Sequence, residues 1–272
     1  MRLEAAGLSY GHGTTNATDE AAWIVMHAAG LPPGDINPHL GESVDAARAR
    51  EARRLVAERI RSRKPAAYLM NEAWLGPHRF YVDERVIVPR SFIAELLLKK
   101  KLGSGYATVL DLCTGSGCLA ILAALAFPEA TVDAADLSAD ALAVARRNVD
   151  DYGLRKRVRL VKSDLFAALR GRRYDLILSN PPYVKASSMR KLPEEYRKEP
   201  AMALASGVDG LDHTRTILAK APAHLTPLGR LVVEIGHNRR ALEKAYPALD
   251  LHWPQTSGGR RFVFSVNRPS LP

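Results

Sequence analysis

The chain has 272 residues, of which 47% are hydrophobic and 25% are charged, with a formal net charge of +10 and a sequence pI of about 9.7. This length suits one large domain or a large and a small one, and the apolar content excludes an intrinsically disordered protein. No apolar run approaches the ~20 residues of a membrane span, and residues 1–19 lack the blocks of a signal peptide, so we expect a soluble, cytoplasmic protein with no membrane partner.

Basic residues gather in short clusters along the chain. The clusters are Arg48–Arg54, Arg61–Lys64, Lys99–Lys101, Arg155–Arg159 and Arg170–Arg173. Their surplus favours a nucleic acid, a ribonucleoprotein or an acidic substrate as partner. Arginine-rich, solvated helix faces give the same composition without any partner, and this alternative stays open.

The N-terminal part, residues 1–66, predicts a small helical domain. Thr18-Asp19-Glu20 cap a helix that continues through Ala29. A loop rich in proline and glycine follows at residues 31–40. A second helix is expected at Ser43–Arg63, where apolar residues fall on one face and arginine and glutamate fill the other.

Residues 67–88 change period, and their short apolar segments, broken by Gly76-Pro77, predict a β-hairpin that links this domain to the rest. After Ser104 strands and helices alternate. Strands are expected at 108–112, 131–135, 158–162, 174–179, 230–235 and 261–266, and helices at 118–127, 139–152, 211–225 and 239–246. Such alternation predicts an α/β fold with a mostly parallel sheet covered by helices on both faces, over residues 89–272.

The segment Asp111–Gly117 follows the first of these strands and opens a helix. Gly115 and Gly117 permit a tight turn and a close backbone approach to a ligand, and the helix amino terminus favours an anionic group such as a carboxylate. A glycine turn that serves only helix packing has the same sequence. Cys113 and Cys118, the two cysteines, lack CxxC spacing and nearby histidines, so we expect them to pack in this turn rather than form a disulfide or metal site.

Three polar residues, Asp136, Asp164 and Asn180, follow later strands of the sheet. The carboxyl ends of parallel strands share the edge at which open α/β sheets bind ligands. Each residue alone is more often a turn or cap residue. With the glycine turn they outline a pocket for a nucleoside with a charged tail, in which Asp136 accepts from ribose hydroxyls and Leu165-Phe166 flank an adenine beside Asp164.

The tetrapeptide Asn180-Pro181-Pro182-Tyr183 is the most informative motif of the chain. Neither proline donates a backbone hydrogen bond, so the strand before them must end and present Asn180 and Tyr183 at its carboxyl end. An amide, two rigid residues and an aromatic ring suit a flat NH2 group. We therefore expect chemistry on a planar nitrogen, with adenine, cytosine or glutamine as the target.

Together these motifs resemble the cofactor and target motifs of protein N5-glutamine methyltransferases. The resemblance extends to Pro65–Leu69, Val88–Ser91, Leu192–Arg197 and Ser206–Leu211, and it covers about residues 65–266. It implies a class I methyltransferase fold, Rossmann-like with a seven-stranded sheet, and an N-terminal substrate-recognition domain. The implied reaction transfers a methyl group from S-adenosylmethionine (SAM) to a glutamine side-chain nitrogen and releases S-adenosylhomocysteine.

The resemblance also assigns the site residues. Those implied to bind SAM are Asp111, Thr114, Gly115, Ser116, Gly117, Asp136, Leu137, Asp164, Leu165 and Asn180. Those implied to hold the target are Asn180, Pro181, Pro182 and Tyr183, of which Asn180, Pro181 and Tyr183 take part in catalysis. Glu199-Pro200 and Ser206–Leu211 are expected to shape a substrate loop, although a plain loop with a helix cap has the same residues. No metal is implied.

Two subgroups of this family compete. One methylates peptide-chain release factors, and the other methylates large-subunit ribosomal protein L3. Cys113 and Cys118 around the turn, and the stretch Pro89–Leu96, resemble the ribosomal-protein subgroup, so a large-subunit ribosomal protein is the implied partner. Phe92 stands where proline is expected, and Asn71 stands where the family often has glycine, which leaves the shape of that turn open.

Two more distant alternatives remain. An adenine-N6 nucleic-acid methyltransferase shares the Asn-Pro-Pro-Tyr motif and suits the net charge, but it would need base flipping on duplex DNA, and a small helical domain stands where a target-recognition module is expected. A non-enzymatic, basic ribosome-binding module with a nucleotide-binding fold would have no reason to keep Asn180 and Tyr183 together.

Overall fold

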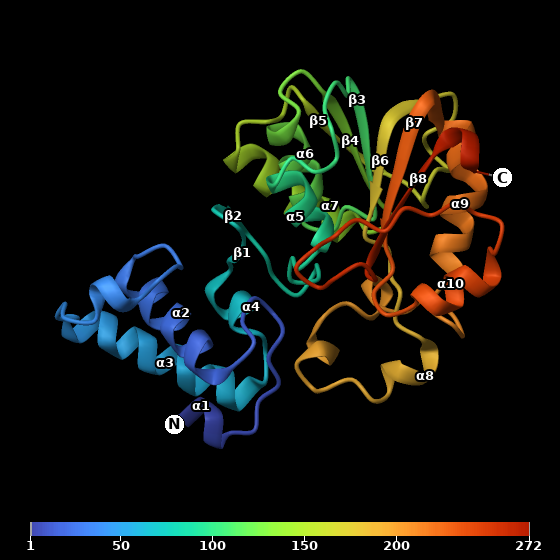
Figure 1. The fold of residues 1–272 in the computed structure, drawn as a ribbon. Coiled ribbons are helices and arrows are strands. Elements are labelled where there is room, and N and C mark those ends of the chain that lie inside the picture. The colour runs from blue at the N-terminus through green and yellow to red at the C-terminus, as the bar shows by residue number, and fades with distance from the viewer. Residues whose placement is uncertain (1, 272) are drawn as a thin grey trace. The chain divides into compact units, whose positions relative to one another are not determined.

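The computed structural model describes residues 2–271, which divide into two compact units (Figure 1). The first unit contains the described residues through Arg90 together with Leu192–Pro200, and the second contains Ser91–Lys191 with residues 201–271. A short segment from the second half of the sequence therefore completes the first unit. No helix among residues 2–271 is long and apolar enough to cross a bilayer.

The first unit is mainly helical. Its elements are α1 (Arg2–Ala5), α2 (Ala17–Ala29), η1 (Asn37–His39), α3 (Ala46–Ser62), α4 (Ala66–Met70), β1 (Ala73–Leu75), β2 (His78–Phe80) and η2 (Tyr196–Lys198). The two predicted helices are present as α2 and α3, and Ile24 and Leu55 are almost fully buried where they pack. The predicted cap at Thr18 is wrong, because Asn16 has the extended backbone of a cap and its side chain accepts from the Asp19 amide.

The hairpin predicted over residues 67–88 is shorter in the structure, because α4 occupies its start. Pro65 stands at the cap of this helix and good helix formers follow, so antiparallel pairing is confined to β1 and β2. Asn71 ends α4 with a left-handed backbone (φ 51°), a conformation that asparagine tolerates better than most residues. Its side chain also donates to the carbonyl of Val82 at 3.1 Å. Asparagine thus forms the turn for which glycine is usual.

The second unit is built on a six-stranded sheet of order β5-β4-β3-β6-β7-β8, in which only β8 runs antiparallel to its neighbour. The strands are β3 (Thr108–Leu112), β4 (Thr131–Asp136), β5 (Val158–Lys162), β6 (Tyr174–Ser179), β7 (Leu225–Glu234) and β8 (Val263–Asn267). The chain winds outward from β3 to β5 and then returns to the other side of β3 with β6. The strand order therefore switches between β3 and β6, where open α/β sheets bind their ligands.

The seventh strand implied by the family resemblance is not formed among the described residues. Its place beside β8 is taken by a single antiparallel bridge between His252 and Ser265, with hydrogen bonds of 2.9 and 2.8 Å. The next hydrogen-bonded position of such a ladder falls on Pro254, which has no N–H to donate. The predicted α/β class and the mostly parallel sheet are otherwise confirmed.

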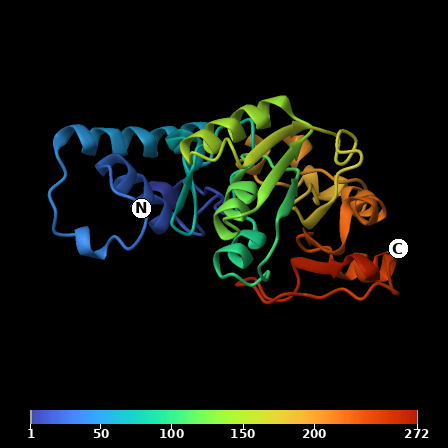
Figure 2. The same ribbon diagram turned by 90° about the horizontal axis from the view of Figure 1, so that it is seen from above.

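Helices cover both faces of the sheet (Figure 2). They are α5 (Phe92–Leu98), α6 (Cys118–Ala126), α7 (Ala139–Asp151), α9 (Asp212–His224) and α10 (Arg239–Ala245), with the short α8 (Ala186–Met189), η3 (Ala201–Ala203) and η4 (Arg268–Ser270) in loops. Helices α5, α6 and α7 lie on one face, and α9 and α10 lie on the other (Figures 1 and 2). A hydrophobic core lies between the sheet and helices α9 and α10. It includes Leu110, Ile177, Leu218, Leu231 and Phe264.

Candidate functional site

The turn after β3 contains three residues with left-handed backbones, Cys113 (φ 60°), Gly115 (φ 55°) and Gly117 (φ 80°). A Cβ on Gly117 would lie 3.1 Å from the Cβ of Ala145, so packing of α6 against α7 accounts for this glycine. A Cβ on Gly115 would meet nothing within 4 Å, so its backbone borders open space. Burial raises the pKa of both cysteine thiols, that of Cys118 to about 12, which keeps them un-ionised and unreactive at neutral pH.

Asp111 is fully buried at the end of β3 and fixes the turn from inside. Its Oδ2 accepts from the Thr114 hydroxyl at 2.6 Å and from the Ala120 amide at 3.1 Å, which joins strand, turn and α6. Its Oδ1 is buried without a hydrogen-bond partner in the described part of the chain. Burial raises the pKa of Asp111 to about 7, and the nearby charge of Asp136 adds to this effect.

Asp136 ends β4 beside the same turn. One carboxylate oxygen accepts from the Gly115 amide and the other from the Ser138 amide, each at 2.9 Å. Burial raises the pKa of Asp136, and only backbone N–H groups oppose this rise. Each oxygen keeps an acceptor position, enough for a pair of hydroxyls. The next residue, Leu137, exposes an apolar side chain (51%).

The segment after β5 is a tight turn held by Ser163. Its hydroxyl donates to the Leu165 carbonyl at 2.7 Å and accepts from the Ala168 amide at 3.0 Å. Leu165 takes a left-handed backbone (φ 46°), which is rare for this residue type, and Asp164 is exposed. Phe166 is only 2% exposed and stacks on His224. The expectation that Phe166 flanks a nucleobase is therefore wrong, because its ring belongs to the core.

Asn180 follows β6 at the carboxyl edge of the sheet. The Ser179 hydroxyl donates to the Leu112 carbonyl at 3.0 Å, so the ends of β6 and β3 are tied together and Asn180 comes close to the glycine turn. The Oδ1 atom of Asn180 is buried and accepts no hydrogen bond from residues 2–271. Pro181 and Pro182, the next two residues, are buried. A buried amide oxygen without a donor costs free energy, so this atom is prepared for a donor that the chain itself does not supply.

Tyr183 is held in place from three sides. Its hydroxyl donates to Oε1 of Glu234 at 3.4 Å, and its carbonyl accepts from the Asn238 side chain at 2.8 Å. Gly236 lies against the ring, because a Cβ there would come within 2.7 Å of a ring carbon. The Gly210 position is equally tight, with 2.4 Å from its Cβ position to the Tyr183 carbonyl oxygen. The ring therefore has a defined orientation at the site.

Sequence reasoning missed Glu234, which joins two of the motifs. Its Oε2 accepts from the Ser91 hydroxyl at 2.7 Å and from the Phe92 amide at 2.8 Å, while Oε1 meets Tyr183. A proline in place of Phe92 would have no N–H for this bond. The sequence signal that could have revealed this role was a glutamate inside the apolar run of residues 231–235. In the structure Glu234 is 2% exposed. Buried acids of this kind need several donors, and here they come from distant segments.

The segment that follows Tyr183 forms a closed loop in the second unit. Val184 and Ala186 pair with residues 204–207 through backbone hydrogen bonds of 2.8–2.9 Å. The residues between these paired stretches include Leu192–Pro200, which belong to the first unit. Among them, Glu199 is 3% exposed. It accepts from the Arg90 guanidinium at 2.6 and 2.7 Å and from the Val88 amide at 2.9 Å. The Glu199 carboxylate is thus engaged inside the first unit.

Comparison with protein families supports a methyltransferase. Residues 92–207 match the model of the methyltransferase small domain. This chain is 52% identical to the ribosomal protein uL3 glutamine methyltransferase of Neisseria meningitidis serogroup B. The alignment covers 99% of this chain and 90% of that protein. It is 50% identical to the protein of the same name from Burkholderia pseudomallei, with 100% of this chain and 92% of that protein covered.

Solved structures agree on the fold. A methyltransferase from Pyrococcus furiosus matches with a TM-score of 0.53 at 19% identity, covering 81% of this chain and 98% of that one. The catalytic domain of hMettl16 in complex with an RNA hairpin of the MAT2A 3′UTR matches with a TM-score of 0.53 at 14% identity, covering 68% and 73%. At these identities the likeness concerns the fold alone. Together with the methyltransferase family model over residues 92–207, it confirms the predicted Rossmann-like methyltransferase class.

Proposed function

We propose, since the chain belongs to the ribosomal protein uL3 glutamine methyltransferase family, that it methylates the side-chain nitrogen of a glutamine in large-subunit ribosomal protein L3 with SAM as methyl donor. The observation that carries this proposal is the buried, partnerless Oδ1 of Asn180 next to the oriented ring of Tyr183. A primary amide offers two N–H donors in one plane. Such a group satisfies the free acceptor and packs flat on the ring.

The residues at the ends of β3, β4 and β5 fit SAM. When bound, SAM supplies a methyl group on a positively charged sulfur. The open backbone of Gly115, with Thr114, Ser116, Gly117 and the amino terminus of α6, would hold the methionine carboxylate. The free acceptor positions of Asp136 would take the ribose hydroxyls. The exposed side chain of Leu137, with Asp164 and Leu165, would border the adenine.

The target nitrogen is a poor nucleophile, because its lone pair is delocalised into the amide carbonyl. Oδ1 of Asn180 and the carbonyl of Pro181 would each accept one of its N–H bonds and fix the nitrogen in line for attack. As the new C–N bond forms, the nitrogen becomes positive and its protons become more acidic. Both acceptors then bind more tightly than in the ground state, which lowers the barrier.

Tyr183 would stabilise the same developing charge. Its ring face attracts a cation, and Gly236 and Glu234 fix the direction of that face. No side chain needs to remove a proton before transfer, because the cationic product loses its proton to water afterwards. The role of this site is to position and stabilise, and this agrees with the absence of an ionisable side chain from Asn180-Pro181-Pro182.

The first unit would recognise the ribosomal protein. The net charge of +10 suits a substrate that is found with ribosomal RNA. Because the proposed substrate is a ribosomal protein, we place the reaction in the cytoplasm, during or before ribosome assembly.

The proposal is tested with the purified chain, labelled SAM, recombinant protein L3 and a recombinant release factor. We expect label in L3, on one glutamine that peptide mass spectrometry identifies by the mass of one added methylene, and none in the release factor. Label in the release factor alone would transfer the chain to the other subgroup. Label in neither, with adenine methylated in an RNA or DNA probe, would overturn the amide as target.

A further inference from the structure

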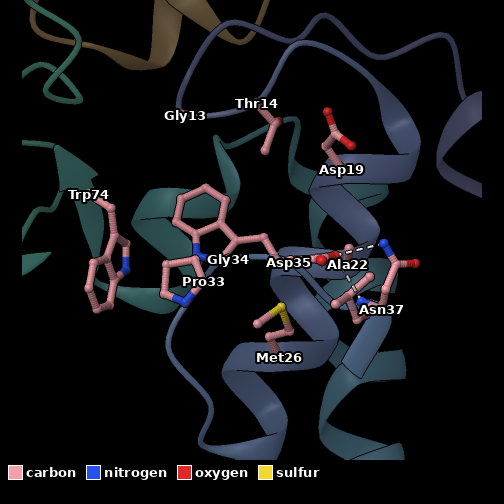
Figure 3. Close-up of a pocket in the computed structure, with 12 residues that line it drawn as sticks. Gly13, Thr14, Asp19, Ala22, Met26, Pro33, Gly34, Asp35, Asn37 and Trp74 are labelled. Carbon is pink, nitrogen blue, oxygen red and sulfur yellow. Dashed lines mark hydrogen bonds between the residues drawn. The ribbon is translucent and has the colours of Figure 1, made fainter. Parts of the chain in front are cut away.

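The first unit contains a cavity of about 380 Å³ that the proposed reaction does not use. Figure 3 shows Trp74 on one side, Thr14 at the top, Met26 at the base, and Asp19 and Asp35 on the side opposite Trp74. The cavity is at the lower end of the range of ligand pockets, about 300–1,000 Å³. It has room for one long side chain with its flanking peptide groups, but not for a folded element.

Two buried polar atoms of this cavity lack partners in the described chain, Nε1 of Trp74 and the hydroxyl oxygen of Thr14. Trp23 provides the contrast within the same cavity, because its Nε1 donates to Oε1 of Glu72 at 3.0 Å. The Trp23 indole is therefore fixed by the fold, whereas the Trp74 indole keeps a free donor. A buried N–H without an acceptor is costly, so the ligand must bring an oxygen acceptor.

The charge of the cavity selects a cation. Asp19 and Asp35 are its charged lining residues, and none of the described lining residues is lysine, arginine or histidine. Within residues 2–271 their hydrogen-bond donors are neutral: the Asn16 side chain donates to Asp19 at 2.7 Å, and Asn37 donates to Asp35 from its side chain at 2.7 Å and from its backbone amide at 3.0 Å (Figure 3). Two uncompensated carboxylates on a chain of net charge +10 repel a nucleic acid and attract a positive group.

We propose that this cavity binds a lysine or arginine side chain of the polypeptide substrate. The ammonium or guanidinium group would lie at the carboxylates of Asp19 and Asp35, and the rest of the side chain would extend across the cavity towards Trp74. A peptide carbonyl beside that side chain would accept from Trp74 Nε1. The inference rests on the proposed function for the identity of the polypeptide, but the chemistry of the cavity can be tested without it.

The first test follows the three tryptophan indole N–H signals of the full chain by NMR, with Trp74 assigned by its loss in Trp74→Phe. The probes are a blocked Gly-Arg-Gly peptide, the same peptide with neutral citrulline, and spermidine. We expect the arginine peptide to shift the Trp74 signal in a saturable way, and D19N/D35N to abolish the shift. An equal shift with citrulline, an equal shift with spermidine, or no shift with the arginine peptide would overturn the proposal.

The second test measures methylation of protein L3. D19N/D35N should raise KM for L3 about tenfold, as expected for the loss of a charged hydrogen bond, with kcat and the Kd of SAM unchanged. The matched control E51Q/E58Q removes two carboxylates from α3, outside the cavity, and should leave KM within about twofold, the range of exposed ion pairs. Unchanged KM in D19N/D35N would overturn the proposal. If the wild-type chain does not methylate L3 at all, the proposed function fails, and the NMR titration still decides the cavity.

Discussion

The first unit surrounds its buried carboxylates with cationic groups, whereas the second leaves Asp111 and Asp136 with backbone N–H groups and a hydroxyl. Glu199 binds Arg90 at 2.6 Å, and His12 lies 3.5 Å away. Within residues 2–271, Asp111 accepts only from the Thr114 hydroxyl and the Ala120 amide. The chain carries 39 lysines and arginines against 29 acids, so a shortage of cations does not explain the difference.

The pKa of Glu199 and the pKa of Asp111 move in opposite directions. Burial raises the pKa of Glu199, but His12 and Arg90 outweigh burial and hold it at about 2. Burial without a cation raises the pKa of Asp111 to about 7. The first pattern is that of a structural ion pair, and the second is that of a site that still lacks a positive partner. A ligand with positive charge, such as SAM, would supply it.

The largest effect is expected from Glu199→Gln, which leaves Arg90 and His12 without their buried partner. The free energy of unfolding at pH 7 should fall by about 3–5 kcal/mol. The folded pKa of Glu199 lies below its ordinary value of 4.5, so its contribution is complete above that pH and is lost as the pH falls towards 2. Urea titrations should therefore show the two proteins converging in acid. The neighbouring E194Q, at a half-exposed position, should change stability by less than about 0.5 kcal/mol.

The next effect concerns Asn180→Ala. We expect kcat to fall about a hundredfold, as for the loss of one preorganised polar contact, with the Kd of SAM almost unchanged. The melting temperature should stay close to that of the wild type, because Oδ1 of Asn180 accepts no bond within residues 2–271. Single-turnover kinetics and calorimetry measure the two quantities. Loss of SAM affinity with intact chemistry would refute the assignment, and N267A, which removes a surface amide, serves as the control.

A smaller effect is expected from Asp136→Asn, which converts one acceptor oxygen into a donor next to the ribose position. The Kd of SAM should rise about tenfold or more, as for a lost hydrogen bond to a charged group. Asp140→Asn changes an exposed acid in the first turn of α7 and should leave the Kd unaltered. Equal Kd values for the wild type and D136N, measured by calorimetry, would remove Asp136 from the cofactor site.

The smallest effect is a pH dependence of SAM binding. Asp111 is mostly protonated below its pKa of about 7, and a positive ligand favours the ionised form. Binding should therefore release protons, and the affinity should rise by up to about tenfold between pH 6 and pH 8. Calorimetry in two buffers of different protonation enthalpy measures this release. In Asp111→Asn the release should be smaller, and an unchanged release would show that another group titrates.

The sheet and the strand ends could be predicted because their signals are local. Apolar runs, glycine turns and the double proline specify strands and their ends within a few residues. The role of Glu234 and the core position of Phe166 could not be predicted in this way, because each depends on partners far along the chain, Ser91 and His224. Pro254 was a local signal against a seventh strand, because proline cannot donate to a ladder. The expectation of seven strands came instead from the family resemblance.

The membership of residues 192–200 in the first unit was also hidden from sequence reasoning. It depends on carboxylates that meet arginines more than a hundred positions earlier, such as Glu195 with Arg63 at 2.9 Å. Asn71 shows the opposite case. Asn71 replaces the usual glycine of the family, so the sequence left the shape of this turn undecided. The turn still forms, because asparagine tolerates the left-handed backbone that it requires.

The late segment of the first unit has a consequence for synthesis on the ribosome. Arg63 and Arg90 emerge early, but Glu195 and Glu199, their buried counter-charges, emerge only after most of the sheet has been translated. The N-terminal unit therefore cannot reach its final state first, as amino-terminal domains usually do. A fragment that ends at residue 90 would carry Arg63 and Arg90 without these acids and Arg59 with Glu20 alone. The nascent chain must wait for residue 200 before this part is complete.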